Sequence, residues 1–356
     1  MTGSITTPAH QRGFLMPPEW AHHAATWTAW PVGEDLWEGF LEPVHADMAG
    51  LVAALSRFEA VELLVLDAVT EASARQHLAS TDADLSRITF HHVAYDDIWL
   101  RDSGPAFVLD PQGCTALVDF RFDGWGKKYE ASRDDQIPTH IAEITGFERF
   151  EATLVLEGGA IEMGPRGWLL TTESCLLDGI RNPGMDKGAY ERALLDQLGV
   201  RKVTWLTGGL VDDHTDGHVD TVVRWANDTT ILCTVPDADD AENQQTLRQN
   251  WTALEQVRDE AGQPLTLVPL PLPRDRSENL GVRSPRTYAN FCFVNGGVLV
   301  PVWNDPRDAD ALAIFADVFP EREIVPVAAS ALITGGGALH CVTQHQPSGG
   351  QGHDHG

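Results

Sequence analysis

The sequence is short of basic residues. It contains 25 lysines and arginines against 52 aspartates and glutamates, which gives a formal net charge of −27 at pH 7. Nucleic acids and anionic membrane surfaces are bound through basic patches that neutralise phosphate, so this composition argues against both as partners. A cationic ligand would be attracted instead. Acidity that serves only solubility, or that reflects a salt-tolerant host, would give the same composition, so charge alone leaves the ligand open.

Long hydrophobic runs are also missing. No apolar stretch reaches the length that spans a bilayer, and residues 1–10 contain no basic segment followed by an apolar one, as a secretion signal would. We therefore expect a cytoplasmic protein. Hydrophobic residues make up 43% of the chain and aromatic residues 8%, values that are typical of a folded globular protein.

Cysteines are few, and their spacing excludes two kinds of site. The five cysteines are odd in number and never form a C-x-x-C pair, so neither a disulfide framework nor a zinc knuckle is indicated. Cys341 stands out because it closely follows three glycines at 335–337, which allow the backbone to approach a ligand closely. If this run is extended, His340 points away from whatever Cys341 contacts. A catalytic partner for the thiol would then come from elsewhere in the chain.

Composition along the chain predicts one large domain with loose ends. Residues 1–12 are expected to form a flexible arm, and 13–346 a single domain, because no break in composition marks a linker. Residues 347–356 are mostly Gly, Ser, Gln and His, which predicts a disordered tail rather than a metal site.

The periodicity of apolar residues predicts an α/β fold built from a repeated unit. Helices are expected at 43–58, 134–144, 187–198, 241–261 and 308–318. Strands are expected at 62–68, 88–93, 106–109, 116–122, 153–156, 168–172, 203–206, 221–225, 230–235, 265–270, 290–294, 298–302 and 324–327. Five principal helices, each followed by a strand, indicate a repeat of several strands and one helix, although the repeats share little sequence.

Two acidic motifs are candidates for binding or catalysis. Asp97, Trp99 and Asp102 lie in a carboxylate-rich stretch at 96–105, and Glu157 stands at the end of an apolar strand before two glycines. Aspartate in a turn often caps backbone amides, and a carboxylate at a strand end also occurs in bulges. Neither motif is therefore specific by itself.

A third motif pairs an imidazole with a carboxylate. In an extended segment, His218 and Asp220 would project from one face, so both could address the same ligand. His214 lies four residues before His218, but the glycine and aspartates between them give no helical pattern that would align the two rings, so we predict no metal site. A fourth, aromatic and glycine-rich stretch at 122–129 is expected to form a wall.

Together these residues favour covalent catalysis by a thiolate on a cationic substrate. A cysteine, a histidine and several acids beside glycines suit a thiol nucleophile. A protease-type Cys–His pair has no need of two or three further carboxylates. A planar guanidinium does, because its fork of N–H donors pairs with carboxylates two at a time.

The chain resembles the agmatine deiminases, within the wider peptidylarginine-deiminase-like group of enzymes that modify guanidino groups. The resemblance covers about 16–347 in family order, and its motifs together are highly specific for the group. It is carried by the segments 16–20, 26–31, 97–105, 125–129, 156–159, 169–177, 217–220, 286–291 and 335–346.

This resemblance implies a five-bladed α/β propeller with pseudo-fivefold symmetry and a central active site. It implies that Cys341 is the nucleophile, that His218 is the general acid and base, and that Glu157 is the charged partner of His218. Asp102 and Asp220 would grip the guanidinium. The implied reaction attacks the guanidinium carbon, releases ammonia, and leaves a thiouronium that water hydrolyses.

The resemblance also implies the surroundings of the reaction. Asp97 and Trp99 would lie near the site with less defined roles. No cofactor and no metal are implied, and the partner is a small cationic guanidino substrate. Formation of a homo-oligomer is an expectation that comes from the family alone.

Three departures from the family pattern concern the choice of substrate. Thr221 stands where asparagine is usual, the family's run of glutamines is interrupted at His345, and the segment 212–216 is unusually acidic. We predict hydrolysis of agmatine to N-carbamoylputrescine and ammonia. The alternatives are deimination of another guanidino compound, such as arginine or peptidylarginine, transfer of the amidino group to an amine, and a non-catalytic cation-binding protein.

Overall fold

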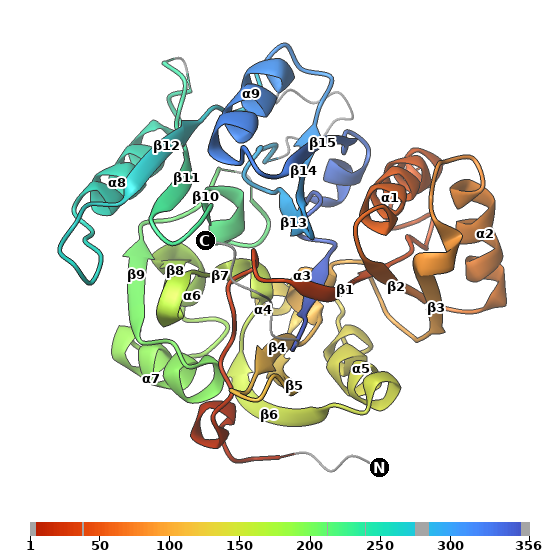
Figure 1. The fold of residues 1–356 in the computed structure, drawn as a ribbon, viewed down its shortest axis with the longest axis horizontal. Helices are drawn as coiled ribbons and strands as arrows, with labels where there is room; N and C mark the ends of the chain where they lie inside the picture. The colour runs from red at the N-terminus through yellow and green to blue at the C-terminus, as the bar shows by residue number, and fades with distance from the viewer. Residues whose placement is uncertain (1–4, 38, 212, 239, 275–284, 350–356) are drawn as a thin grey trace.

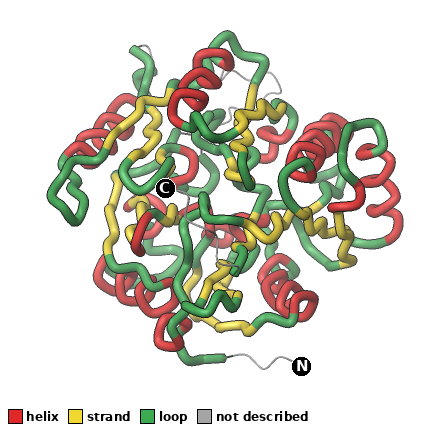
Figure 2. Tube along the Cα trace, viewed as in Figure 1, coloured by secondary structure: helices red, strands yellow, loops and turns green. Residues whose placement is uncertain are grey.

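Five small sheets are arranged around one centre (Figure 1). The computed structural model describes residues 5–37, 39–211, 213–238, 240–274 and 285–349. Four sheets have three strands and one has four, and each sheet forms one blade of the ring. Figure 2 shows the longer helices along the rim, whereas loops and short helices gather near the centre. The connections at the centre are therefore the ones placed to carry chemistry.

The three-stranded blades share one plan. The strand nearest the centre runs antiparallel to the middle strand, and the middle strand runs parallel to the outer one. Parallel neighbours need a crossover, which a helix supplies in each blade. The four units are β4 (Ala106–Leu109), β5 (Thr115–Arg121), α5 (Ile137–Thr145) and β6 (Glu148–Val155); β7 (Ile161–Met163), β8 (Trp168–Thr172), α7 (Lys187–Leu198) and β9 (Lys202–Leu206); β10 (Val223–Trp225), β11 (Thr230–Thr234), α8 (Gln244–Glu255) and β12 (Thr266–Leu270); β13 (Cys292–Val294), β14 (Gly297–Val302), α9 (Asp308–Val318) and β15 (Glu323–Ala328).

The four-stranded blade is assembled from both ends of the described chain. The strand nearest the centre of the ring, β16 (Gln344–Pro347), runs antiparallel to β1 (His23–Ala29). The crossover helix α1 (Leu41–Ser56) then leads to β2 (Ala60–Val65), which pairs in parallel with β1. A second helix, α2 (Ala68–Leu78), then leads to the outer strand β3 (Ile88–His92). The strand that follows Cys341 thus closes the ring against the first strand of the chain.

The five predicted helices are present, whereas α2 and the four-residue helices α3 (Leu100–Ser103), α4 (Gly124–Lys127) and α6 (Glu173–Leu176) were missed. The helices α1, α5, α7, α8 and α9 lie where the periodicity places them, although α8 ends at Glu255 rather than at residue 261. The pattern missed α2, because Ala74 and Leu78 are its only buried residues and its apolar stripe is correspondingly thin. The strands β1, β7 and β16 were also missed. Within the described ranges, no helix is both long enough and apolar enough to cross a bilayer.

Two segments that were read as extended are turns. Val219–Thr221 forms a 3₁₀ helix, so His218 and Asp220 do not project from one face of a strand. Leu332–Gly335 forms another, and the chain around Cys341 is also a turn that precedes β16. Side-chain alternation along a strand therefore does not govern either motif.

The described part of the N-terminal segment packs on the ring. Ile5 pairs with Phe150, and the short 3₁₀ helix Ala9–Arg12 buries its first residue. Residues 1–4 of the predicted arm and 350–356 of the predicted tail lie outside the described residues.

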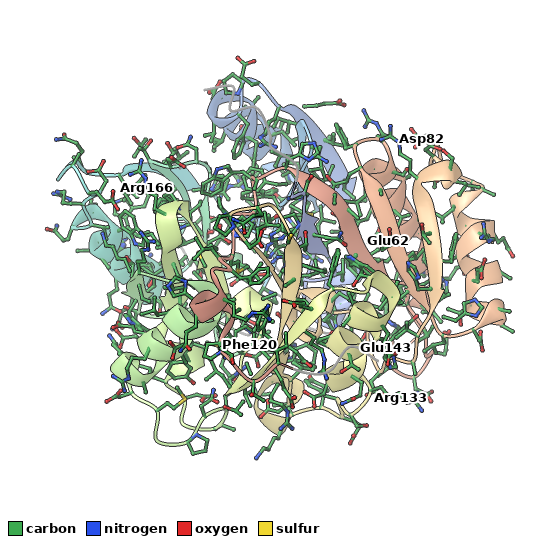
Figure 3. All side chains as sticks on the ribbon, turned by 60° about the horizontal axis from the view of Figure 1, so that its bottom comes forward. Glu62, Asp82, Phe120, Arg133, Glu143 and Arg166 are labelled. Carbon is green, nitrogen blue, oxygen red and sulfur yellow. The ribbon has the colours of Figure 1, made fainter. Side chains whose placement is uncertain are left out.

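Charged side chains cover the outside of the ring. Asp82, Arg133 and Glu143 are exposed and lie at the periphery of the molecule in Figure 3. The acids singled out from the sequence contrast with them, because Asp102, Glu157 and Asp220 number among the buried residues. Burial of several carboxylates in one place is costly unless a positive charge compensates it, which marks the centre as a functional region.

Candidate active site

The segment before the innermost strand of each blade carries a chemically distinctive residue to the centre. Five loops that are remote in sequence therefore build one site. Their residues are Asp102 before β4, Glu157 before β7, His218 and Asp220 before β10, Asn290 before β13, and Cys341 before β16. All six are at most 7% exposed. The ring thus brings together the predicted catalytic residues, and it adds Asn290.

Cys341 lies in a turn that the side chain of Asn290 holds. The Asn290 Oδ1 accepts hydrogen bonds from the backbone N–H groups of His340 and Cys341, at 3.1 and 3.3 Å. The Asn290 Nδ2 lies 3.1 Å from the Cys341 sulfur, and Asp220 Oδ2 lies 3.7 Å from that sulfur. Burial raises the pKa of the Cys341 thiol well above its ordinary value, and the charges of Asp220 and Asp102 raise it further. A positive charge beside these acids would oppose that rise.

Asp102 and His218 meet above Gly159. Asp102 Oδ1 accepts from the Gly159 N–H at 2.9 Å, and its Oδ2 accepts from the indole N–H of Trp125 at 2.9 Å. The His218 Nδ1 lies 3.7 Å from Asp102 Oδ1. A Cβ at position 159 would lie 2.5 Å from that nitrogen and 3.2 Å from Asp220 Oδ2, so only glycine fits.

The imidazole of His218 is buried and uncharged. Neither ring nitrogen has a hydrogen-bond partner among the described residues. Burial lowers the pKa of His218 to about 3, although the charge of Asp220 acts in the opposite direction. A neutral ring with a free lone pair can accept a proton, as a general base must.

The pKa values of the two carboxylates that face this site are shifted in opposite directions. Burial raises the pKa of Asp102 well above its ordinary range, and the charges of Asp220 and Glu157 add to the rise. Burial also acts to raise the pKa of Asp220, but the hydrogen bond and charge of His340, together with the charges of His218 and Arg224, outweigh it and lower that pKa. Asp220 Oδ1 has no hydrogen-bond partner among the described residues, so it is a free acceptor.

Glu157 pairs with an arginine rather than directly with His218. Its carboxylate accepts from Arg181 Nε at 2.7 and 3.0 Å, and both side chains are fully buried. Burial raises the pKa of Glu157, and the Arg181 charge opposes that rise. A Glu157 oxygen and a His218 nitrogen lie within 4.8 Å of each other, but no hydrogen bond joins the two side chains. The role of Glu157 as the partner of His218 therefore stays a prediction.

Asp97 and Trp99 line the entrance to the site. Asp97 Oδ2 accepts from the Trp99 indole N–H at 2.9 Å, and Oδ1 accepts from the next backbone N–H at 2.8 Å. Burial raises the pKa of Asp97 to about 6. Gly335 and Gly337 pack against Trp99, and a Cβ on either would lie 2.6 Å from the indole ring. The glycines therefore admit an aromatic wall beside the nucleophile.

A cavity of about 290 Å³ opens onto these residues. Trp37, Trp99 and Trp125 line its walls, and Asp102 and Cys341 also line it. The stretch 122–129 contributes Trp125 and Tyr129, so its predicted role as a wall is confirmed. Aromatic rings and carboxylates that line one cavity suit a flat, delocalised cation.

Asp220 belongs to a charge network that the sequence patterns did not reveal. His340 was expected to point away from the site, but its Nδ1 lies 2.7 Å from Asp220 Oδ2. Its Nε2 lies 2.7 Å from Glu19 Oε2, which also accepts from Arg224 at 2.6 Å. Burial acts to raise the pKa of Glu19, but Arg224, His340 and Arg101 together lower it well below its ordinary value. The only available signal was that Glu19 belongs to one of the matched motifs.

Three groups of described side chains have the spacing of metal ligands. Two lie at the centre, namely Glu157 with Cys175 and His218, and Glu19 with Glu162 and His340. In each central group an arginine already pairs with a carboxylate. The third group, on the helices of the four-stranded blade, is described below. That the reaction needs no metal or cofactor stays a prediction.

Relatives named agmatine deiminase match the chain over nearly its whole length. The protein of that name from Stutzerimonas stutzeri strain A1501 is 35% identical over 97% of this chain and 98% of its own. The one from Pseudomonas aeruginosa strain LESB58 is 36% identical over 98% of this chain and 99% of its own.

Solved structures of similar proteins have the same fold. The agmatine deiminase of Enterococcus faecalis superposes with a TM-score of 0.90 at 29% identity, covering 98% of this chain and 99% of its own. A substrate-bound cysteine-to-serine variant of the C. jejuni agmatine deiminase superposes with a TM-score of 0.85 at 25% identity, covering 94% and 96%. An amidinotransferase from Microseira wollei, at 10% identity and a TM-score of 0.56, shares the fold alone.

The five-bladed α/β propeller predicted from the sequence is thus confirmed. The model of one protein family also matches residues 15–347, which span every blade of the ring. The chain therefore belongs to the Porphyromonas-type peptidyl-arginine deiminase family.

Proposed function

We propose that the protein hydrolyses agmatine to N-carbamoylputrescine and ammonia through a covalent intermediate on Cys341. One observation carries this proposal: a thiol, a neutral imidazole and two carboxylates from three different blades converge at one cavity with aromatic walls. The names of the relatives that match the full length support agmatine as the substrate.

The guanidinium group supplies the positive charge that compensates the buried carboxylates. Its planar N–H donors suit two carboxylates, and Asp220 Oδ1 is a free acceptor for one of them. Asp102 keeps a fixed orientation because Gly159 and Trp125 each donate to one of its oxygens. A cation between the two acids lowers the pKa of each, so substrate binding favours the ionised pair that holds it.

The same positive charge activates the nucleophile. Burial and the two acids hold the pKa of Cys341 high, and a guanidinium beside the sulfur opposes the effect of the acids. The thiol transfers its proton to His218 as the sulfur attacks the guanidinium carbon. His218 returns this proton to the departing nitrogen, which leaves as ammonia. A thiouronium remains on Cys341.

Water completes the reaction. His218, neutral again, removes a proton from the attacking water and gives it to the sulfur as the carbon–sulfur bond breaks, which regenerates the thiol. The positively charged product then loses its hydroxyl proton to solvent and becomes the neutral ureido group. Asn290 donates to the sulfur from 3.1 Å and so stabilises negative charge on it at both steps.

The setting that we propose for this reaction is the cytoplasm. All five cysteines are free, as is usual where thiols are kept reduced. Assembly into a homo-oligomer remains an expectation from the family.

One assay separates the candidate functions. The purified protein is incubated with agmatine, free arginine and a blocked arginine peptide, and ammonia and ureido product are measured against the Cys341→Ala variant. We expect turnover of agmatine, and none by the variant. Preference for the peptide or for arginine would replace the substrate but keep the chemistry. Equal signal from the variant, or no turnover of any guanidine, would exclude covalent deimination.

A further inference from the structure

Two histidines and a glutamate meet on the outer helices of the four-stranded blade. Glu42 and His45 belong to α1 and His77 belongs to α2, which lie at the rim of the ring in Figure 1. The side chains of His45 and His77 are 10% and 17% exposed, whereas that of Glu42 is 81% exposed. None of the three lines the central cavity, and the proposed reaction does not use them.

Backbone carbonyls determine which nitrogen of each ring carries hydrogen. His45 Nε2 lies 2.9 Å from the carbonyl oxygen of Pro31, and His77 Nδ1 lies 2.8 Å from that of Ser73. A carbonyl oxygen only accepts, so these two nitrogens are the N–H donors. In a neutral ring the other nitrogen then carries a lone pair. Those nitrogens are His45 Nδ1 and His77 Nε2.

Both lone-pair nitrogens face the same carboxylate. His77 Nε2 lies 3.2 Å from Glu42 Oε1, and His45 Nδ1 lies 3.8 Å from Glu42 Oε2. His45 is 8% exposed, and its Nδ1 is a buried polar atom without a hydrogen-bond partner among the described residues. A proton on His77 would satisfy one of these contacts but would leave His45 Nδ1 unpaired. A metal ion bound by all three side chains would pair with the lone pairs of both ring nitrogens and of the carboxylate.

The surroundings of the rings are those of metal ligands. A ligating histidine usually donates its other N–H to a carbonyl or carboxylate, which orients the ring, and both rings do so here. The Trp30 ring also stacks on His45, with centroids 5.0 Å apart and planes 13° apart. The three donor atoms lie within 4.8 Å of one another. With bonds of 2.0–2.2 Å, a tetrahedral zinc ion requires donor atoms about 3.4 Å apart, which small side-chain shifts achieve.

We propose that Glu42, His45 and His77 form a binding site for a divalent transition metal of the zinc class, with a fourth position open to water. Two imidazoles and one carboxylate are ligands that such ions prefer over magnesium or calcium. The exposed Glu42 gives the ion access to the site from solvent.

A bound ion would join α1 to α2 and so stabilise the outer part of this blade. Helix α1 also supports the nucleophile loop, because Asp47 accepts from the backbone N–H groups of Ala331 and Leu332 at 2.7 and 3.0 Å. The ion is therefore expected to raise thermal stability without taking part in the reaction.

The test is a zinc titration of the full-length protein after treatment with a chelator. Heat release and the melting temperature are measured in a background that carries Cys341→Ser, His353→Gln and His355→Gln, because a thiol or a histidine-rich tail could also bind metal. Added to this background, Glu42→Gln and His77→Gln each remove one ligand. His92→Gln is the matched control, since His92 pairs with Glu71 at 2.8 Å on the same blade but belongs to none of the possible metal-ligand groups among the described residues.

We expect one equivalent of zinc to bind and to raise the melting temperature in the background protein and in the His92→Gln control. Affinity should fall by at least about tenfold in Glu42→Gln and in His77→Gln. Cobalt should give a tetrahedral absorption band that His77→Gln abolishes. The proposal is overturned if no zinc binds, or if the ligand variants bind it as tightly as the control.

Discussion

Asn290 holds both the sulfur and the backbone of Cys341. Its Nδ2 lies 3.1 Å from the sulfur, and its Oδ1 accepts from the Cys341 N–H at 3.3 Å. One amide thus joins two neighbouring blades at the nucleophile, because Asn290 precedes β13 and Cys341 precedes β16.

The Asn290→Asp variant separates these two tasks. An aspartate keeps an oxygen for the backbone N–H groups but replaces the donor to sulfur with a negatively charged acceptor. A hydrogen bond to a charged group is worth about 1.5–3 kcal/mol, so kcat/KM should fall about ten- to hundredfold. The alkaline shift of the pH profile is the specific readout, because thiolate formation becomes harder. Asn227→Asp, in an exposed turn, is the control; an unshifted profile in the Asn290 variant would contradict the role.

His218→Ala should abolish most turnover while the protein still folds. A positioned acid or base typically contributes ~10²–10⁴-fold in rate. Neither His218 nitrogen has a hydrogen-bond partner in the described part of the chain, so removal of the ring leaves no described hydrogen-bond partner unpaired. Steady-state rates and thermal unfolding are measured together, with the partly exposed His140→Ala as control. Near-normal turnover would remove His218 from its role.

A single methyl group at position 159 should block the site. In Gly159→Ala the new Cβ would lie 2.5 Å from His218 Nδ1 and 2.9 Å from Asp102 Oδ1, so both groups must move. We expect kcat to fall by at least about a hundredfold, since small misplacements of catalytic groups have effects of that size. Gly50→Ala in α1 is the matched control. A Cβ added at Gly50 has no neighbouring heavy atom within 4 Å, so this variant should keep full activity. An active Gly159→Ala variant would show that the site tolerates this shift.

Asp134→Asn should stabilise the protein, and more so as the pH rises. Burial raises the pKa of Asp134 to about 7, and the charges of Asp96 and Asp97 add to the rise. The folded state therefore favours the protonated acid, and stability is lost as the pH rises from about 4 to 7. Asparagine avoids this loss and can still accept, through Oδ1, the backbone N–H bonds of Asp96 and Asp97.

Urea unfolding of both proteins at several pH values measures this effect. The advantage of Asp134→Asn should grow by about 2 kcal/mol between pH 5.5 and pH 8, because each pKa unit corresponds to about 1.4 kcal/mol. It should vanish below about pH 4, where the acid is protonated in both states. An advantage that does not change with pH would mean that the acid is ionised in the fold.

Local patterns predicted the chemistry of this site better than the hydrogen bonds that connect its residues. Cys341 after three glycines and Asp102 in an acidic stretch were visible as motifs, and the family resemblance assigned their roles. Asn290, His340 and Glu19 act through contacts between segments that are far apart in sequence, and no local periodicity reports such contacts.

Errors in secondary structure have a similar cause. The inner strand β7 spans only Ile161–Met163, and β16 only Gln344–Pro347, so neither is long enough to show an alternating pattern. Their pairing partners hold them extended. The turn at Val219–Thr221 also depends on contacts that are remote in sequence. The hydroxyl groups of Thr172 and Ser174 donate hydrogen bonds to the carbonyl oxygens of Gly217 and Asp216, just before this turn.

The pairing of β16 with β1 also sets when the enzyme becomes reactive during its synthesis. A ribosome that adds 5–20 residues per second needs on the order of tens of seconds to pass from the first of these strands to the last. Until β16 emerges and pairs with β1, Cys341 has not been translated or lacks the strand pairing that places it beside Asn290. A nascent or prematurely terminated chain therefore carries the acids but no assembled nucleophile, so guanidine chemistry begins only with the finished polypeptide.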